Sequence, residues 1–257
     1  MNTKQILISV TLVAMAFLTS CKQDELIYSC DPVVDAWTKA NIDEIRAMSR
    51  TDFLNLSMAH QRAAFNVYTP QQRINLWKEK LEETLLLEWT ASERIHIETL
   101  LNMVVNNDEW FSNDRSEEVM DQIAIEIYRW TEYAREELGW DRKLGYALLG
   151  TPQIMNAHKE VNSSLPLPSF SKQEGSGNRG KCECSTSSNW CSDTGCLYVA
   201  SCDASSLGCG TMWLYSCDGL CIDAITGATI LVCPICGQSC HGTDCPNPTC
   251  EICNPVK

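Results

Sequence analysis

Cysteine content constrains this chain more than any other sequence feature, because fourteen of its sixteen cysteines fall between residues 182 and 253. A density of about one residue in five is too high for ordinary core packing, and is typical of a small domain held by disulfides or metal. We predict disulfides at fourteen positions: Cys182, Cys184, Cys191, Cys196, Cys202, Cys209, Cys217, Cys221, Cys233, Cys236, Cys240, Cys245, Cys250 and Cys253.

The N-terminal residues indicate the compartment, and therefore the cross-link. Lys4 precedes an apolar run over residues 6–18 that is too short to span a bilayer and is typical of a signal peptide. The run ends in Leu18-Thr19-Ser20-Cys21, which resembles a bacterial lipobox and implies cleavage after Ser20 and a lipid on Cys21. The alternatives are a plain signal peptide and a buried apolar helix.

The residues behind Cys21 refine the expected location. Asp24 and Glu25 resemble the surface-export signal of Bacteroidetes-type lipoproteins, which implies an outer-membrane lipoprotein that faces outward. Thiols oxidise outside the cytoplasm, so disulfides are the expected cross-link there.

The formal charge of −13 narrows the range of partners. Nucleic acids and anionic membranes attract basic surfaces, so we expect no nucleic-acid partner for this acidic chain. We expect it to attach to a membrane only through the N-terminal lipid. Residues 181–257 carry two lysines against seven acidic side chains, which argues against a cationic membrane-disrupting peptide. The expected target is an unknown protein or another envelope component.

Shifts in composition divide the chain into six segments. We predict a lipoprotein signal peptide at 1–20, a lipid-anchored tether at 21–30, an α-helical domain at 31–160, a Ser/Gly/Pro linker at 161–180, a cysteine-rich module at 181–221 and a second cysteine-rich tail at 222–257. The predicted fold is a mainly α N-terminal helical bundle followed by a small disulfide-rich C-terminal domain.

Capping signals and apolar stripes carry the helical prediction. Asp31-Pro32, Thr69-x-x-Gln72 and Thr90-x-x-Glu93 are helix starts, and Gly139 is a helix stop. Charged residues are expected mostly opposite the stripes, on the solvent side. The stripes are Val34, Trp37, Ile42, Ile45 and Met48; Phe53, Leu56, Ala63, Phe65 and Val67; Ile74, Trp77, Leu81 and Leu85; Ile97, Leu100, Leu101 and Val104; Val119, Ile123, Ile127, Trp130 and Ala134.

Two motifs in residues 182–221 carry a family resemblance. The paired Cys182 and Cys184 with the following Ser-Thr, and the run Cys-Gly-Thr-x-Trp-x-Tyr-x-Cys from Cys209 to Cys217, resemble the bacteriocin fulvocin C-related family. Residues 69–86, with Arg73, Leu76, Trp77 and Lys80, resemble the helical leader of such proteins. The resemblance implies a bacteriocin-like module made within a longer exported chain. Cleavage between about Lys172 and Lys181 would free it, and the alternative is a permanent two-domain lipoprotein.

Aromatic residues of the module are its candidate target contacts. Trp190, Tyr198, Trp213 and Tyr215 are predicted to form an exposed patch that meets a receptor or lipid. The alternative is a small core beside the disulfides.

The tail offers a metal alternative. Cys233-x-x-Cys236 and Cys250-x-x-Cys253 resemble a zinc ribbon, but disulfides are favoured in an oxidising exterior, so no cofactor is expected and zinc is the alternative. Cys30 is left over beside two even-numbered blocks, and eight cysteines alone allow 105 pairings.

The remaining residues predict no enzyme. The four histidines are scattered, and no nucleophile elbow or phosphate-binding loop occurs, so we assign no catalytic residue. The expected function is a lipid-anchored exported protein with a bacteriocin-like module, released to act on competing bacteria. The alternative is a non-toxic cell-surface interaction protein with a disulfide-stabilised or zinc-binding C-terminal domain.

Overall fold

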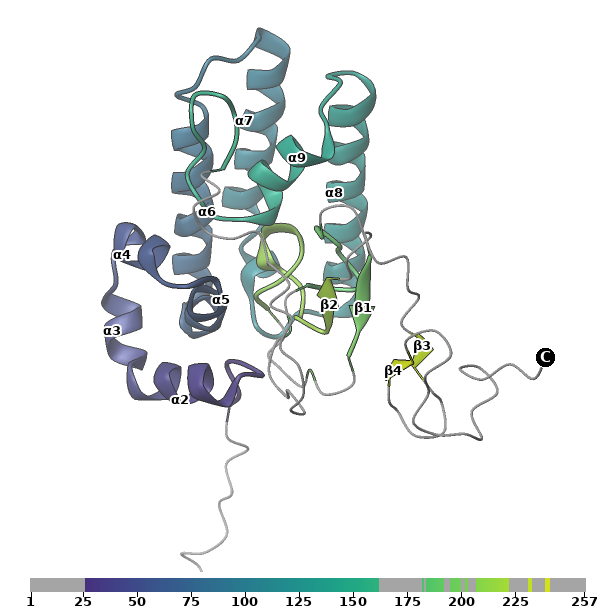
Figure 1. Cartoon of the computed structure of the whole chain (residues 1–257). Helices are drawn as coiled ribbons and strands as arrows, with labels where there is room; N and C mark the ends of the chain where they lie inside the picture. The colour runs from purple at the N-terminus through teal and green to yellow at the C-terminus, as the bar shows by residue number, and fades with distance from the viewer. Residues whose placement is uncertain are drawn as a thin grey trace, which may run out of the picture.

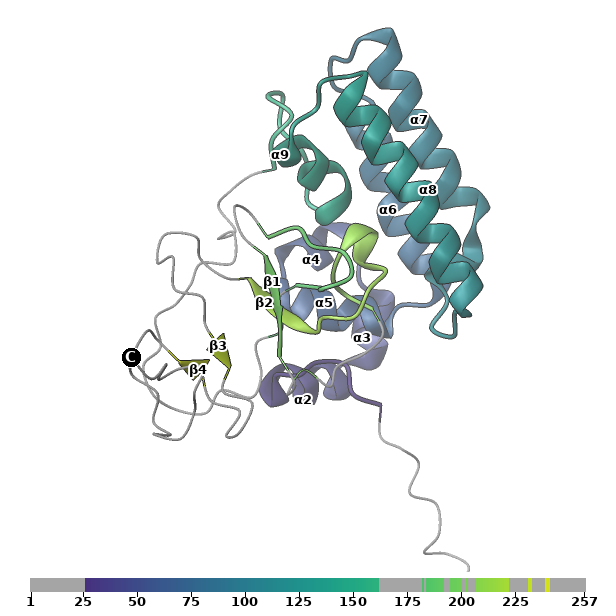
Figure 2. The same cartoon turned by 90° about the vertical axis from the view of Figure 1, so that its right-hand side faces the viewer.

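The computed structural model describes residues 26–161, 182, 184–191, 195–199, 202 and 207–221, together with the backbone of two short strands at 231–232 and 239–240. It is mainly helical, and the described cysteine-rich residues between 182 and 221 lie against the helices (Figures 1 and 2). The predicted signal peptide, Cys21, the linker from residue 162 and the zinc alternative at Cys233, Cys236, Cys250 and Cys253 lie outside the described residues.

The first part of the helical region consists of short helices. They are α2 (Pro32–Ala40), α3 (Ile42–Ala47), α4 (Arg50–Asn55) and α5 (Met58–Val67). Asp31 caps α2 as predicted, accepting hydrogen bonds from the backbone N–H groups of Val33 and Val34. Each of the two apolar stripes predicted here is divided between two helices. The first is divided at Asn41, where α2 ends and α3 begins, and the second at Ser57, whose hydroxyl group caps α5.

Three longer helices follow: α6 (Pro70–Thr84), α7 (Ala91–Asn106) and α8 (Glu117–Glu136). Both predicted capping boxes are present, at Thr69 and at Thr90, and Gly139 has the positive φ of a helix stop just beyond α8. Figures 1 and 2 show these helices side by side, with the short helices gathered near one end. The predicted helical bundle is therefore not confirmed, although the mainly helical fold is.

Each predicted stripe residue is buried or half-buried. The core also includes the 3₁₀-helix η2 (Asp108–Phe111), which contributes Trp110 and Phe111, and the π-helix η3 (Tyr146–Gly150), which follows the short helix α9 (Arg142–Gly145). Core residues from the cysteine-rich region join this cluster, namely Leu207, Met212, Trp213 and Leu214.

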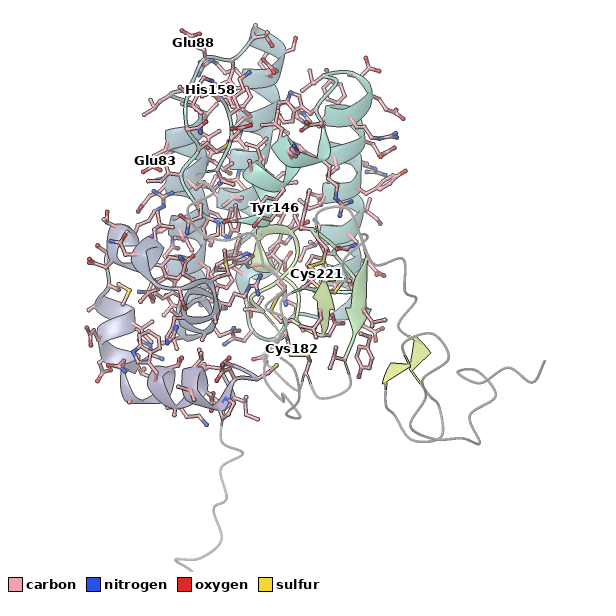
Figure 3. All side chains as sticks on the ribbon, viewed as in Figure 1. Glu83, Glu88, Tyr146, His158, Cys182 and Cys221 are labelled. Carbon is pink, nitrogen blue, oxygen red and sulfur yellow. A yellow bond between two sulfur atoms is a disulfide. The ribbon has the colours of Figure 1, made fainter. Side chains whose placement is uncertain are left out.

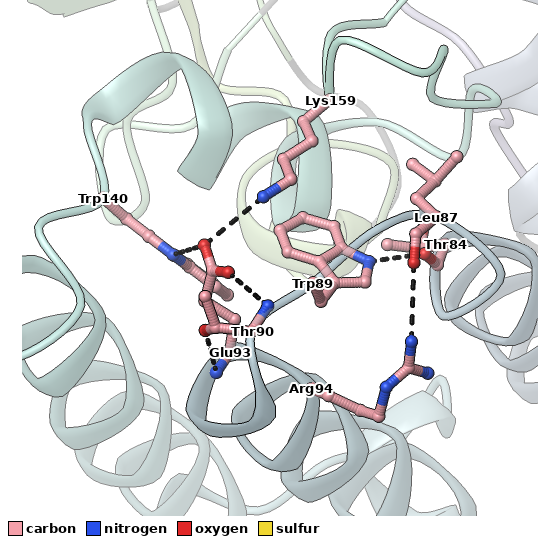
Figure 4. A network of polar contacts seen from close by, with 8 residues as sticks. All are labelled: Thr84, Leu87, Trp89, Thr90, Glu93, Arg94, Trp140 and Lys159. Atoms are coloured by element: carbon pink, nitrogen blue, oxygen red, sulfur yellow. Dashed lines mark hydrogen bonds and ion pairs between the residues drawn. The ribbon is translucent and has the colours of Figure 1, made fainter.

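A polar network ties the start of α7 to the chain that follows α8 (Figure 4). Glu93 Oε1 accepts hydrogen bonds from Trp140 Nε1 at 3.1 Å and from Lys159 Nζ at 3.4 Å, while Lys159 Nζ lies 4.1 Å from the Trp89 ring centroid. Burial raises the pKa of the Glu93 carboxyl, but hydrogen bonds from Thr90 and Trp140 and the Lys159 charge outweigh it and hold this pKa below its usual range. The network therefore favours an ionised Glu93.

His96 joins α7 to α8. Its ring stacks on Trp130 with centroids 4.3 Å apart, its Nε2 lies 3.0 Å from the Trp130 carbonyl oxygen, and Trp130 Nε1 donates to the His96 carbonyl oxygen at 2.9 Å. Burial lowers the pKa of His96, and the hydrogen bond to Trp130 offsets this only in part. His96 is therefore neutral at neutral pH, with Nε2–H as the donor.

We expect this histidine to make the fold sensitive to mild acid. The unfolded chain binds a proton at His96 near pH ~6.5, the folded chain only at lower pH, so stability falls as pH drops below about 6.5. Thermal melts at about pH 7.5 and about pH 5.5 should show a smaller drop in Tm for His96→Gln than for wild type. The exposed His158→Gln variant is the control; an equal drop in all three proteins would contradict the prediction.

Strands occur only after the helices in the part of the chain described here. β1 (Cys196–Tyr198) and β2 (Gly219–Cys221) pair antiparallel, with Cys196 opposite Cys221. β3 (Leu231–Val232) and β4 (Ser239–Cys240) form a second antiparallel pair. Among the residues that the structure describes, no helix is long and apolar enough to cross a membrane.

Candidate functional site: the cysteine-rich module on the helical body

Four disulfides hold the module over residues 182–221. They join Cys182 to Cys202, Cys184 to Cys196, Cys191 to Cys221 and Cys209 to Cys217. All eight predicted cysteines of this block are thus paired with one another, and the structure selects one connectivity from the 105 that the sequence allows. Cys182 and Cys221 are labelled in Figure 3, where they lie beside the helices.

The Cys209–Cys217 motif folds into a tight turn. Cys209 and Tyr215 exchange two backbone hydrogen bonds of 2.9 and 3.0 Å, and the disulfide closes the base. The tip is the 3₁₀-turn η4 (Thr211–Trp213), in which Met212 and Trp213 have positive φ angles of 48° and 56°. Gly210 has a φ of 70°, and a Cβ there would lie 2.7 Å from Ser188 Cβ, so the motif requires glycine.

The tip of this turn inserts into the core of the helical body. We call Leu207, Met212, Trp213 and Leu214 the plug; each is at most 1% exposed. The Trp213 ring lies 5.6 Å from that of Phe65 and 6.3 Å from that of Phe53, centroid to centroid. Its Nε1 donates to the Gly150 carbonyl oxygen at 3.1 Å, at the end of η3. Trp213 therefore packs against both α4 and α5 and bonds to the chain after α9.

Side chains of the helical body also bind the backbone of the plug. Arg115 Nη1 donates to the Leu214 carbonyl oxygen at 2.5 Å, and Asn66 Nδ2 donates to that of Leu207 at 3.0 Å. On another side of the module, Arg142 Nη2 donates to the carbonyl oxygens of Asn189 and Cys191 at 2.9 and 3.0 Å. The contact between helices and module is therefore both apolar and hydrogen-bonded.

The other residues that carry the family resemblance fasten the module internally. Thr186 donates to both carboxylate oxygens of Asp218, from its N–H at 2.7 Å and its hydroxyl at 2.6 Å. Thr211 Oγ1 accepts from Trp190 Nε1 at 2.9 Å and lies 2.9 Å from Ser188 Oγ. Thr186, Ser188 and Thr211 thus have hydrogen-bond partners in the folded module.

The predicted exposed aromatic patch is wrong for Trp213. Trp213 is 1% exposed because it fills the core between α4, α5 and η3, where it cannot meet an external target. Trp190 and Tyr215 are half-buried; Trp190 packs near Tyr146, with the Arg142 guanidinium 6.0 Å from its ring centroid. Tyr198 on β1 is 62% exposed and is the member of the set that stays available.

Two buried cations in α6 were missed by sequence reasoning. Arg73 is 0% exposed and donates to the carbonyl oxygens of Phe65, Phe111 and Asn66 at 2.9, 2.7 and 3.0 Å. Lys80 is 1% exposed, and its Nζ donates to the Gln153 carbonyl oxygen at 2.6 Å. Burial, with the Arg50 charge adding to it, holds the pKa of Lys80 well below its usual range.

The spacing of Arg73 and Lys80 along α6 is the sequence signal that could have predicted their burial. Arg73, Trp77, Lys80 and Thr84 recur at steps of four and three residues, the spacing of a single helix face, and all four are buried. The expectation that charged residues lie opposite the stripes therefore fails at Arg73 and Lys80, whose side-chain N–H groups instead satisfy backbone carbonyl groups.

Cys30, the cysteine left over by parity, lies at the edge of the module. Its Sγ is 2.8 Å from Cys182 Sγ, and the sulfur atoms of Cys30, Cys182 and Cys202 all lie within 4.8 Å of one another. The sulfurs of Cys184, Cys191 and Cys221 also lie within 4.8 Å of one another, and all three take part in disulfides.

Comparison with known proteins identifies no relative: no family model matches the chain, and no similar curated protein or solved structure was found. The resemblance to the fulvocin C-related family therefore stays a prediction from the sequence motifs.

Proposed function

We propose that this chain is an exported, lipid-anchored surface protein whose cysteine-rich module works in place on the helical body, by contact with a protein or another envelope component. The single observation that carries this choice is the plug, because Trp213 and its neighbours complete the core of the helical body. If the module left the helical body, Trp213 and its neighbours would lose the core in which they are buried. The non-toxic interaction protein is thus favoured over the diffusible bacteriocin.

Three further observations support the proposed location. The lipobox ending at Cys21 provides the anchor, and the acidic pair behind it provides the outward orientation. Four disulfides among residues 182–221 fit an oxidising compartment. Tyr198 is the aromatic residue that we assign to target contact, since it is exposed on β1.

Cutting the linker on intact cells tests the proposal. A site for a sequence-specific protease is inserted after Gly175 in a Cys30→Ser background, so that only non-covalent contacts join the two pieces. We expect both pieces to stay with the cells after cleavage, because the buried plug and its hydrogen bonds hold the module. Fractionation and immunoblotting of each piece measure this.

A matched variant separates anchoring from retention. With Cys21→Ala, both pieces should move to the soluble fraction together, while denaturant should separate them and show that the cut is complete. Appearance of the C-terminal piece alone in the medium would contradict retention and favour the released bacteriocin. Membrane association of Cys21→Ala would contradict the lipid anchor.

A further inference from the structure

Three cysteine sulfurs meet where the N-terminal segment touches the module. Cys182 and Cys202 form a disulfide, and Cys30 Sγ lies 2.8 Å from Cys182 Sγ, closer than the van der Waals separation of two sulfur atoms. All three residues are half-buried, so solvent and small thiols reach the group. A thiol beside a disulfide sulfur is the starting arrangement for thiol–disulfide exchange.

Local structure holds each partner in place. Cys30 directly precedes the N-cap Asp31 of α2, and the Tyr28 N–H donates to Asp35 Oδ1 at 2.7 Å, which fixes the segment against the helix. On the module side, Cys184 forms a β-bridge with Gly219, and the Cys202 N–H donates to the Val199 carbonyl oxygen at 2.9 Å. The contact between Cys30 and Cys182 thus joins two structured segments that are 152 residues apart in the chain.

We propose that Cys30, Cys182 and Cys202 form a disulfide-exchange site that moves a covalent link between the module and the N-terminal segment. The Cys30 thiol gives its proton to water, and its sulfur bonds to Cys182 Sγ. The Cys182–Cys202 bond breaks, its electron pair stays on Cys202 Sγ, and this thiolate takes up a proton. One disulfide and one thiol are present before and after, so the step needs no oxidant.

The exchange changes what is covalently connected. In one state, the Cys182–Cys202 disulfide closes a loop inside the module. In the other, the Cys30–Cys182 disulfide ties the module to the segment that follows the predicted lipid site at Cys21. A chain cut in the linker would remain covalently joined in the second state only. This inference does not depend on the proposed function, since it concerns sulfur chemistry alone.

The tryptic map of the chain makes the test direct. Trypsin cuts after Lys22 and Lys39 to give a peptide, 23–39, that contains Cys30, and it cuts after Lys181 to give 182–257 as one piece, because no internal Lys or Arg follows. The purified full chain is incubated with a low concentration of glutathione, quenched in acid, alkylated and digested without reduction. We expect peptide 23–39 to appear partly at the mass of its disulfide with 182–257. A peptic digest should then place the alkyl label on both Cys30 and Cys202.

Two cysteine variants sharpen the result. After exposure to glutathione disulfide, Cys202→Ser should shift nearly all of peptide 23–39 to the linked mass, because Cys182 then has Cys30 as its neighbour. Cys196→Ser is the matched control, since it leaves Cys30, Cys182 and Cys202 intact and exposes a thiol at Cys184, in a different disulfide. Its linked fraction should stay at the wild-type level, and the peptic digest should show Cys30 joined to Cys182 and not to Cys184. In wild type, a label confined to Cys30 would overturn the proposal whether or not the variants fold. Equal capture of Cys30 by Cys184 would also overturn it, as unspecific reshuffling.

Discussion

Replacing Trp213 with alanine should destabilise the helices as strongly as the cysteine-rich module. Removing a buried tryptophan costs about 3–5 kcal/mol of unfolding free energy, and the Gly150 carbonyl oxygen loses its donor as well. Since Trp213 packs on Phe53 and Phe65, the helical signal itself reports the loss. Far-ultraviolet circular dichroism during denaturant unfolding should show one transition at a lower midpoint.

Two further substitutions separate packing from hydrogen bonding. Trp213→Phe keeps a ring beside Phe65 but removes the Nε1 donor. Its free energy of unfolding should therefore lie between that of wild type and that of Trp213→Ala. Tyr198→Ala alters an exposed aromatic in the same module and should change stability by only about 0.5 kcal/mol or less. An unchanged helical midpoint in Trp213→Ala would show that the module does not share the core.

Local signals in the sequence predicted the helix starts well. Each predicted cap, at Asp31, Thr69 and Thr90, joins a side chain to a group within three residues. A short sequence pattern therefore includes both partners of each hydrogen bond. The apolar stripes of α6, α7 and α8 follow for the same reason, because one helical period decides which face is buried. The division of the second stripe at Ser57 could also have been predicted, because serine is a preferred helix cap.

Long-range interactions explain what sequence reasoning missed. Trp213 lies in a stretch rich in cysteine, and nothing local reveals that its partners are Phe53, Phe65 and the Gly150 carbonyl group. The disulfide connectivity is likewise set by the folded chain and not by spacing. The resemblance of the Cys209–Cys217 motif to a bacteriocin-like family predicted a target surface, but Trp213 is buried in the core of its own chain.

Arg73→Met should be as damaging as the loss of Trp213, although arginine is usually a surface residue. Arg73 binds carbonyl groups at the end of α5 and at the end of η2, where helical carbonyls have no partner within their own helix. Methionine fills similar space but leaves three buried carbonyls without donors. Each unpaired carbonyl group costs about 1–3 kcal/mol, and removal of the desolvated charge offsets part of this cost. We therefore expect Arg73→Met to lower the free energy of unfolding by about 3–5 kcal/mol.

The charge state and the geometry of Arg73 can be tested separately. Burial, and then the neighbouring Arg115 charge, lower the pKa of Arg73 to about 10, so it stays protonated at neutral pH. Arg73→Lys keeps a positive charge but not the three-directional donor set, and it should recover only part of the stability. The exposed Arg129→Met is the matched control and should fall within about 0.5 kcal/mol of wild type.

A double-mutant cycle then connects the two predictions. Arg73 holds the Phe65 carbonyl group while Trp213 packs on the Phe65 ring, so the two residues act on the same part of α5. Their combined effect should differ from the sum of the single effects by about 0.5–3 kcal/mol, as found for residues that share a partner. Strict additivity would mean that Arg73 stabilises α5 without helping to position the surface that receives the plug. Coupling would mean that Arg73 in α6 and Trp213 in the module, which are far apart in the sequence, stabilise the same core.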